Sequence, residues 1–216
     1  MERVLRLAAL SALFSLAPAP FQSSVEPLSK PVRQQLKDNG SWHQGCPVGL
    51  SDLRLLTVTY SGFDRRSHTG KLVVNKTAAQ PLERVFRKLY SYRFRIRHMR
   101  FEDQYGPRRS RPDDGDVSGS FECRDAVPSP CASAAGRSWS MHAYGLAVDL
   151  NPVENPYVGC GRSRDPAARP YLDRSRHRKG MVGGRVVRAF RSIGWGWGGT
   201  WTGNTKDYMH FSSTGH

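Results

Sequence analysis

The chain has 216 residues, of which 38% are hydrophobic, and this suits one domain with a buried core. Charged residues make up 24% and aromatic residues 10%, so the composition excludes wholesale disorder. The formal net charge of +15 favours anionic partners such as nucleic acid, anionic membranes or anionic cell-wall polymers. The charge alone does not choose among these partners. The alternative is that the charge mainly keeps a secreted protein soluble.

Residues 1–20 are typical of a secretory signal peptide. Two arginines precede an apolar run at residues 7–16, and the small-residue sequence "APAP" follows. The run is too short to span a bilayer as a mature helix. We therefore expect a secreted or cell-envelope protein, in the bacterial extracellular space or periplasm, without a transmembrane anchor once the leader is removed. Pro20 would directly follow the cleaved bond, and a proline at that position suits signal-peptide cleavage poorly.

The first half of the chain predicts two strands and a helix. Residues 21–44 are polar with prolines, and we interpret them as a linker or irregular arm. Residues 53–63 and 70–75 are rich in β-branched residues and predict strands. Apolar residues three and four apart predict a helix at 81–90. Alternating basic and apolar residues at 95–101 predict a half-exposed strand.

The second half contains more loops. Residues 104–120 are rich in Asp, Gly, Pro and Arg and predict a loop, and residues 151–180 predict another. "GLAVDL" at 145–150 predicts a strand, and residues 183–194 predict a helix. Strands mixed irregularly with a few helices indicate an α+β domain with a mainly antiparallel sheet.

The chain has four cysteines, Cys46, Cys123, Cys131 and Cys160. None forms a CxxC pair, which makes a zinc ribbon improbable, and an even number in an exported chain favours two disulfide bonds. Three pairings are possible and the sequence does not choose among them. Buried free thiols are the alternative.

One acidic residue stands out in "GLAVDL". Alternation places Ala147 and Asp149 on one face of the strand and its large apolar residues on the other. A buried carboxylate without a partner would cost several kcal/mol. Asp149 therefore needs a cation, an arginine or several hydrogen-bond donors. His142 lies just upstream, across a turn that Gly145 permits.

A second histidine and acid stand near the end of the chain, in "DYMHF" at residues 207–211. His142, Asp149 and His210 would form a three-ligand zinc site with an open position for water, and Asp207 would remain as a general base. Spacing alone also fits a satisfied core histidine, a salt-bridged Asp149 and a surface Asp207. The HExxH pattern is absent, which excludes a helical thermolysin-like site.

These segments resemble a known family. "SMHAYGLAVD" at 140–149, followed by "DYMH" at 207–210, resembles the signature of the D-alanyl-D-alanine carboxypeptidase (VanY-like) family of zinc peptidases. That family includes L-alanyl-D-glutamate endopeptidases, and its fold resembles the hedgehog signalling domain. An extracellular branch of it is also similar in "GCPV", "GKLVVN", "FECR", "NPVENPYV" and "GWGWGGTW". The resemblance covers residues 45–216.

The resemblance implies roles for five residues. It implies one Zn²⁺ ion with His142, Asp149 and His210 as ligands, and Asp207 as the general acid and base. Arg124, in "FECR", falls where the family places an arginine that polarises the scissile carbonyl. A guanidinium there would stabilise the oxyanion of the tetrahedral intermediate. The alternative for Arg124 is an ordinary surface arginine.

The resemblance also implies a fold and an activity. It implies a monomeric hedgehog/DD-peptidase-like domain at 45–216 that hydrolyses peptide bonds in peptidoglycan stem peptides, as a D-alanyl-D-alanine carboxypeptidase. The alternatives are an L-alanyl-D-glutamate-type endopeptidase and a non-enzymatic, zinc-stabilised cell-wall-binding module. We expect no nucleic-acid partner, because no nucleic-acid-binding motif occurs, and anionic cell-wall polymers account equally well for the charge.

Three further features have two interpretations each. We expect Ser140 to cap the turn before His142, rather than to touch substrate. We expect Trp197 and Trp201, in "GWGWGGTW", to pack in the core, and the alternative is that they wall a cleft. The basic segment "RSRHRKG" at 174–180 predicts a solvated loop, with contact to a polyanion as the alternative.

Overall fold

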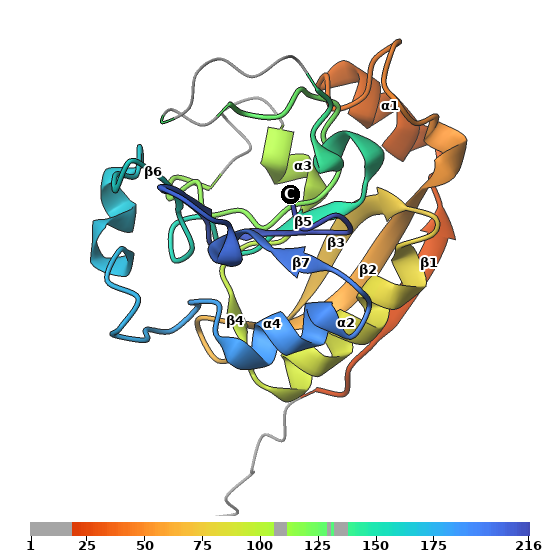
Figure 1. The fold of residues 1–216 in the computed structure, drawn as a ribbon. Helices are drawn as coiled ribbons and strands as arrows, with labels where there is room; N and C mark the ends of the chain where they lie inside the picture. Colours follow the sequence, from red (N-terminus) through yellow and green to blue (C-terminus); the bar gives the residue numbers. More distant parts are fainter. Residues whose placement is uncertain (1–18, 106–111, 129–130, 132–137) are drawn as a thin grey trace, which may run out of the picture.

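The structure is a computed structural model, and it describes residues 19–105, 112–128, 131 and 138–216. The predicted leader lies outside the described residues except for its last two positions. Within the described residues, no helix has the length and apolar character needed to cross a membrane. Helices and mainly antiparallel sheets make up the chain, so the predicted α+β class is confirmed (Figure 1).

The largest sheet has the order β1-β2-β3, and its three strands are antiparallel. Strands β2 (Leu53–Gly62) and β3 (Ser67–Asn75) confirm the two predicted strands. The short strand β4 (Arg95–Ile96) adds to β2 in parallel. The strand predicted at 95–101 is therefore realised only at its start, and α3 (Phe101–Tyr105) begins at its end.

The interpretation of residues 21–44 as an irregular arm is wrong. Strand β1 (Ser23–Pro27) pairs with β2, and α1 (Lys30–Asp38) follows it. Ser29 caps α1 by accepting a hydrogen bond from the backbone N–H of Val32. Strand β1 lies at the edge of the sheet and buries little of its surface, so its composition is polar. The fold therefore begins before residue 45.

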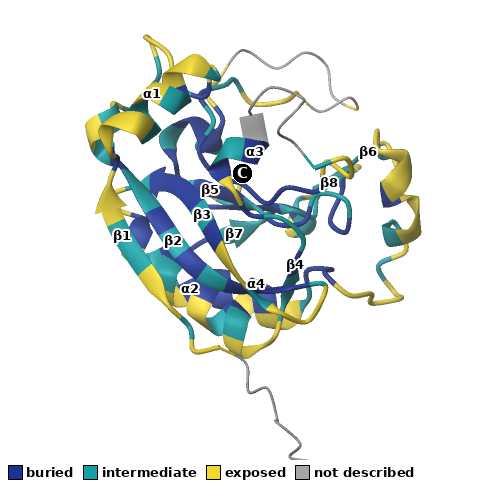
Figure 2. Ribbon diagram, turned by 180° about the vertical axis from the view of Figure 1, so that it is seen from behind, coloured by how far each residue is buried: buried dark blue, intermediate teal, exposed yellow. Residues whose placement is uncertain are grey.

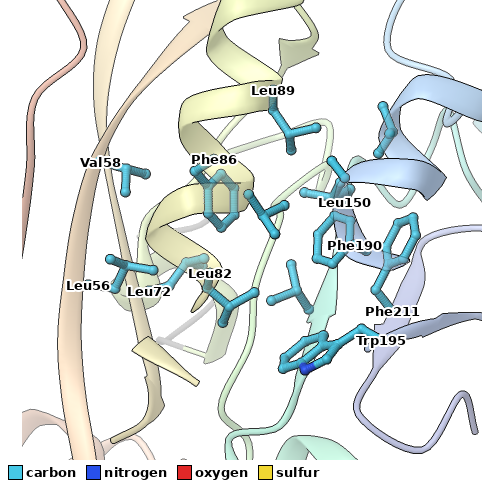
Figure 3. Packing of buried hydrophobic residues seen from close by; sticks show 14 of the residues in the cluster. Leu56, Val58, Leu72, Leu82, Phe86, Leu89, Leu150, Phe190, Trp195 and Phe211 are labelled. Atoms are coloured by element: carbon cyan, nitrogen blue, oxygen red, sulfur yellow. The ribbon is translucent and has the colours of Figure 1, made fainter. Parts of the chain in front are cut away.

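The core lies between this sheet and two helices. Helix α2 (Ala79–Ser91) and helix α4 (Gly184–Arg191) confirm the two predicted helices, and both are amphipathic. Figure 3 shows Phe86 of α2 between Val58 of the sheet and Phe190 of α4. The rings of Phe190 and Phe211 stack with centroids 3.9 Å apart. Figure 2 shows the buried residues gathered between these layers.

Two smaller sheets follow in the second half of the chain. One has the order β5-β9-β7 and the other pairs β6 with β8, all antiparallel. Their bounds are β5 (Ala147–Asp149), β6 (Tyr157–Gly159), β7 (Gly196–Trp197), β8 (Thr205–Asp207) and β9 (His210–Ser212). Single 3-10 turns are η1 (Leu50–Asp52), η3 (Met141–Tyr144), η4 (Pro166–Tyr171) and η5 (Gly198–Thr200).

The four cysteines form two disulfide bonds, as predicted. Cys46 pairs with Cys123, and Cys131 pairs with Cys160. The first bond joins the segment after α1 to residues 117–124, where the backbone of Gly119 forms an antiparallel bridge with Asp149 of β5. The disulfide therefore fixes a segment that borders the candidate site described next.

Candidate metal centre

The ladder between β5 and β9 brings Asp149 opposite His210. The register pairs Val148 with Phe211 and Asp149 with His210. Val148 and Phe211 are fully buried in the core. Because successive side chains of a strand point to opposite faces, Asp149 and His210 share the other face. The strand predicted from "GLAVDL" is confirmed, and its acid faces a histidine from the far end of the sequence.

A short turn positions His142 beside this pair. Ser140 is the N-cap of η3, and its side chain accepts a hydrogen bond from the His142 backbone N–H at 3.3 Å, so the predicted capping role is confirmed. The turn ends at Gly145 with φ of +66°, the left-handed region. A Cβ atom at Gly145 would lie 2.6 Å from the backbone nitrogen of Asn75. A side chain would therefore displace the turn that carries His142.

A backbone carbonyl fixes the orientation of the His142 ring. The Nδ1 atom lies 2.5 Å from the carbonyl oxygen of Ser120. A carbonyl only accepts, so Nδ1 carries the hydrogen and Nε2 presents its lone pair in the neutral ring. Sequence reasoning missed Ser120, because a backbone carbonyl leaves no side-chain signal.

Donor atoms of three residues converge at nearly equal distances. His142 Nε2 lies 3.1 Å from Asp149 Oδ2, His210 Nδ1 lies 3.1 Å from Asp149 Oδ1, and the two ring nitrogens lie 3.2 Å apart. A tetrahedral zinc ion with bonds of about 2.0–2.1 Å holds its donors about 3.3 Å apart. The donor types and their spacing therefore fit one zinc ion.

The charge of the cluster agrees with this fit. Burial acts to raise the pKa of Asp149, but the charges and hydrogen bonds of His142 and His210 outweigh it and hold the pKa well below its usual range. Among the described residues, no lysine or arginine lies within ion-pair distance of Asp149. An ionised carboxylate between two imidazoles attracts a cation.

Asp207 ends β8, three residues before His210. Burial, and then the negative charge of Asp149, raise the pKa of Asp207 to about 7. Its Oδ1 atom is buried and has no hydrogen-bond partner in the part of the chain that the structure describes. A Cβ atom at Gly198 would lie 2.9 Å from the Asp207 Cβ, so this glycine allows η5 to pass close to the acid. Asp207 is therefore not an ordinary surface carboxylate.

Arg124 lines the same cavity as these residues. Its Nε donates to Glu122, and its Nη1 donates to the carbonyl oxygen of Asp125 at 3.2 Å. The charge of Arg124 is one of the influences that act to lower the pKa of Asp207, although burial outweighs them. Sequence reasoning named Arg124 and missed Glu122, two positions earlier in "FECR". The ion pair with Glu122 restrains the guanidinium group.

The cavity has a volume of about 440 Å³ and aromatic walls. Trp139 lines it and is 36% exposed, and Trp201 lines it near the His210 ring. The expectation that Trp197 and Trp201 both pack in the core is correct for Trp197, which packs on the core and donates to the Tyr208 carbonyl at 2.9 Å. It is wrong for Trp201, because the chain turns at η5 between them.

Another group of donor-type residues also lies close together, namely His43, Cys46 and Cys123. The two cysteines are joined in a disulfide bond, so neither offers a thiolate. Among the described residues, His142, Asp149 and His210 therefore remain as the metal-binding candidate.

The fold and the cluster define a candidate mononuclear metal centre of the hydrolase type: two histidines, one carboxylate and an adjacent acid in an open cavity. Residues 133–213 match a family described as D-alanyl-D-alanine carboxypeptidase. The resemblance that the motifs indicate is therefore confirmed, and the match includes the three donors and Asp207 but not Arg124. Neither the curated proteins nor the solved structures gave a match.

Proposed function

We propose that this chain is a zinc-dependent peptidase that removes the terminal D-alanine from peptidoglycan stem peptides. The observation that carries the proposal is the convergence of His142, Asp149 and His210 at 3.1–3.2 Å within a segment that matches the carboxypeptidase family. The disulfide bonds and the leader-like N-terminus support action outside the cytoplasm.

The proposed ligand atoms are His142 Nε2, His210 Nδ1 and a carboxylate oxygen of Asp149. A zinc ion there would supply a bound water with a pKa near 7 and would polarise the scissile carbonyl. The hydrogen bond from His142 Nδ1 to the Ser120 carbonyl fixes the ring orientation and turns Nε2, the lone-pair nitrogen of the neutral ring, toward the cluster. Asp149 supplies the negative charge that makes a divalent cation favourable.

Asp207 is the proposed proton carrier. It accepts a proton from the attacking water while the new bond from oxygen to the carbonyl carbon forms. It then donates this proton to the leaving nitrogen while the carbon–nitrogen bond breaks. A pKa near 7 suits both transfers, because the carboxyl exchanges a proton at little cost in either direction.

Arg124 is the proposed oxyanion partner. The carbonyl oxygen gains negative charge as water adds, and a guanidinium held in place beforehand stabilises that charge by about 2.7–4 kcal/mol if it acts like a typical oxyanion donor. The pairing of its Nε with Glu122 supports such preorganisation. The aromatic walls formed by Trp139 and Trp201 would reduce water access beside the peptide.

The test is a digest of purified muropeptides followed by mass spectrometry, with and without a chelator. Release of free D-alanine that stops with the chelator and returns with Zn²⁺ is the expected result. Fragments cut within the stem peptide would replace the carboxypeptidase by an endopeptidase. A protein that binds zinc and muropeptides but yields no product would refute the enzymatic function.

A further inference from the structure

A second cavity, of about 510 Å³, lies between the segment after α2 and the start of α4. It shares no lining residue with the cavity of the metal centre. No acidic residue lines it, and nearly half of its lining residues are basic or histidine. These residues are Arg93, Arg95, His177, Arg178, Lys179 and Arg185.

An adjoining cavity extends this basic surface. It has a volume of about 420 Å³, shares Arg93 and Arg95 with the first, and adds Arg65. No acidic residue lines this cavity either. We call the two together the basic groove, defined by the lining residues of both cavities. Together the two cavities offer more room than a single small anion requires.

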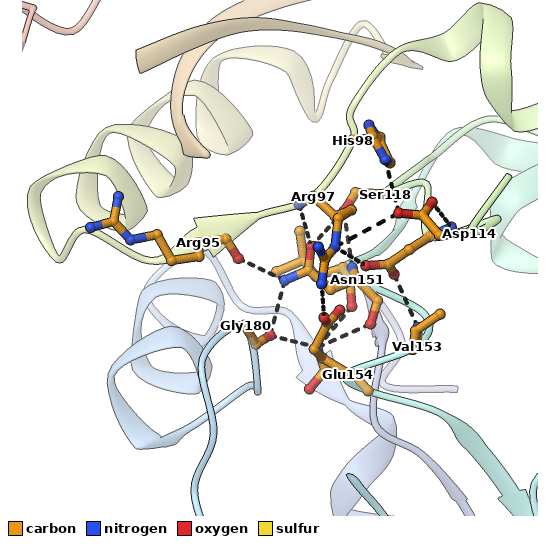
Figure 4. Close-up of polar contacts among 12 residues, drawn as sticks. Arg95, Arg97, His98, Asp114, Ser118, Asn151, Val153, Glu154 and Gly180 are labelled. Carbon is orange, nitrogen blue, oxygen red and sulfur yellow. Dashed lines mark hydrogen bonds and ion pairs between the residues drawn. The ribbon is translucent and has the colours of Figure 1, made fainter. Parts of the chain in front are cut away.

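Buried amides hold the walls of the basic groove in place. Asn151 Nδ2 donates to the carbonyl oxygens of Arg95 at 2.7 Å and Gly180 at 2.9 Å, so one side chain ties both walls together. Asn155 also donates to Gly180 and accepts from the backbone N–H of Val182. Both asparagines are fully buried. Figure 4 shows the Arg95 side chain pointing away from this network.

The positive charges of the groove have no internal counter-charge. Among the described residues, none of its arginines or its lysine lies within ion-pair distance of a carboxylate. Arg97, only two residues from Arg95, is by contrast paired with Asp116 and Glu154. Like charges held side by side on a fixed backbone repel one another, and a polyanion relieves that repulsion.

We propose that the basic groove binds an anionic cell-wall polymer with repeated phosphodiester groups. Arginine presents paired N–H donors that match phosphate oxygens, and several arginines along a groove match a phosphate repeat. The groove itself does not depend on the proposed function, but the choice of a wall polymer as occupant rests on it. Attachment away from the metal centre would raise the local concentration of the enzyme at its insoluble substrate.

The test compares two variants that each lose three positive charges. The groove variant carries Arg178→Gln, Lys179→Gln and Arg185→Gln, three exposed positions that line the groove. The control variant carries three exposed positions that line neither cavity, namely Lys30→Gln, Arg164→Gln and Arg169→Gln. The probe is polyglycerol phosphate, and binding is measured between about 50 and 200 mM salt, a range over which charge-driven binding changes strongly.

The groove variant should bind polyglycerol phosphate about ten-fold more weakly or worse, with a salt dependence lower by about two to three units of slope. The control variant should stay within about three-fold of the wild type, because its cations lie outside the groove. Equal weakening of both variants, or of neither, would overturn the proposal. Duplex DNA or RNA binding the groove more tightly than the polymer would also overturn it, in favour of a nucleic-acid site.

A soluble stem peptide separates this proposal from the proposed function. Both variants should release D-alanine from it at the wild-type rate, because neither changes the metal-centre cavity. A wild-type chain without peptidase activity that still binds the polymer through the groove would refute the proposed function alone. Normal peptidase activity without groove-dependent polymer binding would refute the groove alone.

Discussion

Two groups of carboxylates, one around Arg97 and one at the metal centre, are compensated in different ways. In the first, Arg97 donates to Asp116 at 3.3 Å and to Glu154 at 2.8 Å, with both acids almost completely buried (Figure 4). In the second, Asp149 is faced by two histidines and by no lysine or arginine among the described residues. The first cluster carries its own cation, and the second needs one from solution.

The Arg97 cluster approaches neutrality through a proton as well. Burial, followed by the hydrogen bond and charge of Glu154, raises the pKa of Asp116 to about 8. Near pH 7 the Asp116 carboxyl is therefore mostly protonated. One arginine then compensates the remaining acid, and the backbone N–H of Val153 donates to Asp116 at 3.0 Å. A cluster that is nearly neutral and internally bonded has a structural role, whereas the metal centre joins its carboxylate to two histidines, which are common metal ligands.

The largest expected effect concerns Asp207, the acid beside the proposed ligands. Asp207→Asn removes the proposed proton carrier, and a general acid–base group typically contributes 10²- to 10⁴-fold. We therefore expect turnover of a muropeptide to fall by about 10²- to 10⁴-fold. Zinc stoichiometry, measured by elemental analysis, should stay at the wild-type value, because Asp207 is not a proposed ligand. Turnover at the wild-type rate would remove Asp207 from the mechanism.

The next prediction removes the arginine of the Arg97 cluster. Arg97→Met leaves two buried acids without their cation, and losing one partner of a buried ion pair typically costs about 3–5 kcal/mol. The free energy of unfolding, from chemical denaturation, should fall by this amount with or without chelator. Arg176→Met is the matched control, because Arg176 is 79% exposed and its partner Asp173 is 55% exposed. Its expected cost is at most about 1 kcal/mol. Equal costs would contradict the comparison.

Removing a donor from the metal centre should have an effect that depends on the cation. A ligand at a thousand times its dissociation constant stabilises a protein by about 4 kcal/mol, so zinc should raise the stability of the wild type by about this much. His210→Ala should bind less zinc and lose most of the difference between zinc-loaded and chelated samples in thermal unfolding. His98→Ala, at a histidine bonded to Asp114 away from the cluster, should keep it. An unchanged difference in His210→Ala would exclude His210 as a ligand.

The sequence predicted the metal centre better than the Arg97 cluster, and the reason is physical. Asp149 interrupts an apolar strand, and its short motif and that of His210, 61 residues away, together resemble the signature of a known family. Asp116 lies in a segment predicted as a polar loop, and its partners Arg97 and Glu154 are 19 and 38 residues away. When a polar residue is buried only because of partners so far away in the sequence, the residues around it show no local pattern that predicts the burial. Ser120 escaped prediction for a related reason, since it acts through its carbonyl.

The same limit applies to the larger elements. Strands β2 and β3 and helices α2 and α4 bury one face each, so their apolar periodicity revealed them. Strand β1 gains its place by backbone pairing along β2, which any polar sequence can provide. Side-chain patterns therefore predicted the elements that form the core, but they did not predict the strand that pairs at the sheet edge.

The smallest expected effect is a pH dependence that belongs to the Arg97 cluster. The pKa of Asp116 is raised to about 8 in the folded chain, against about 3.9 in an unfolded one. Between these values the folded state holds a proton that the unfolded state has lost, so stability is greatest at low pH and falls as the pH rises toward 8. For one proton the slope is at most about 1.4 kcal/mol per pH unit, and sharing of the proton with Glu154 makes it smaller. Asp116→Asn keeps an acceptor for Val153 and cannot titrate. The free energy of unfolding is measured by urea denaturation from pH 5 to 8 with chelator present. It should decline less steeply with pH for this variant than for the wild type. Parallel curves for the two proteins would show that Asp116 does not hold the proton, and the two clusters would then differ only in their arginine.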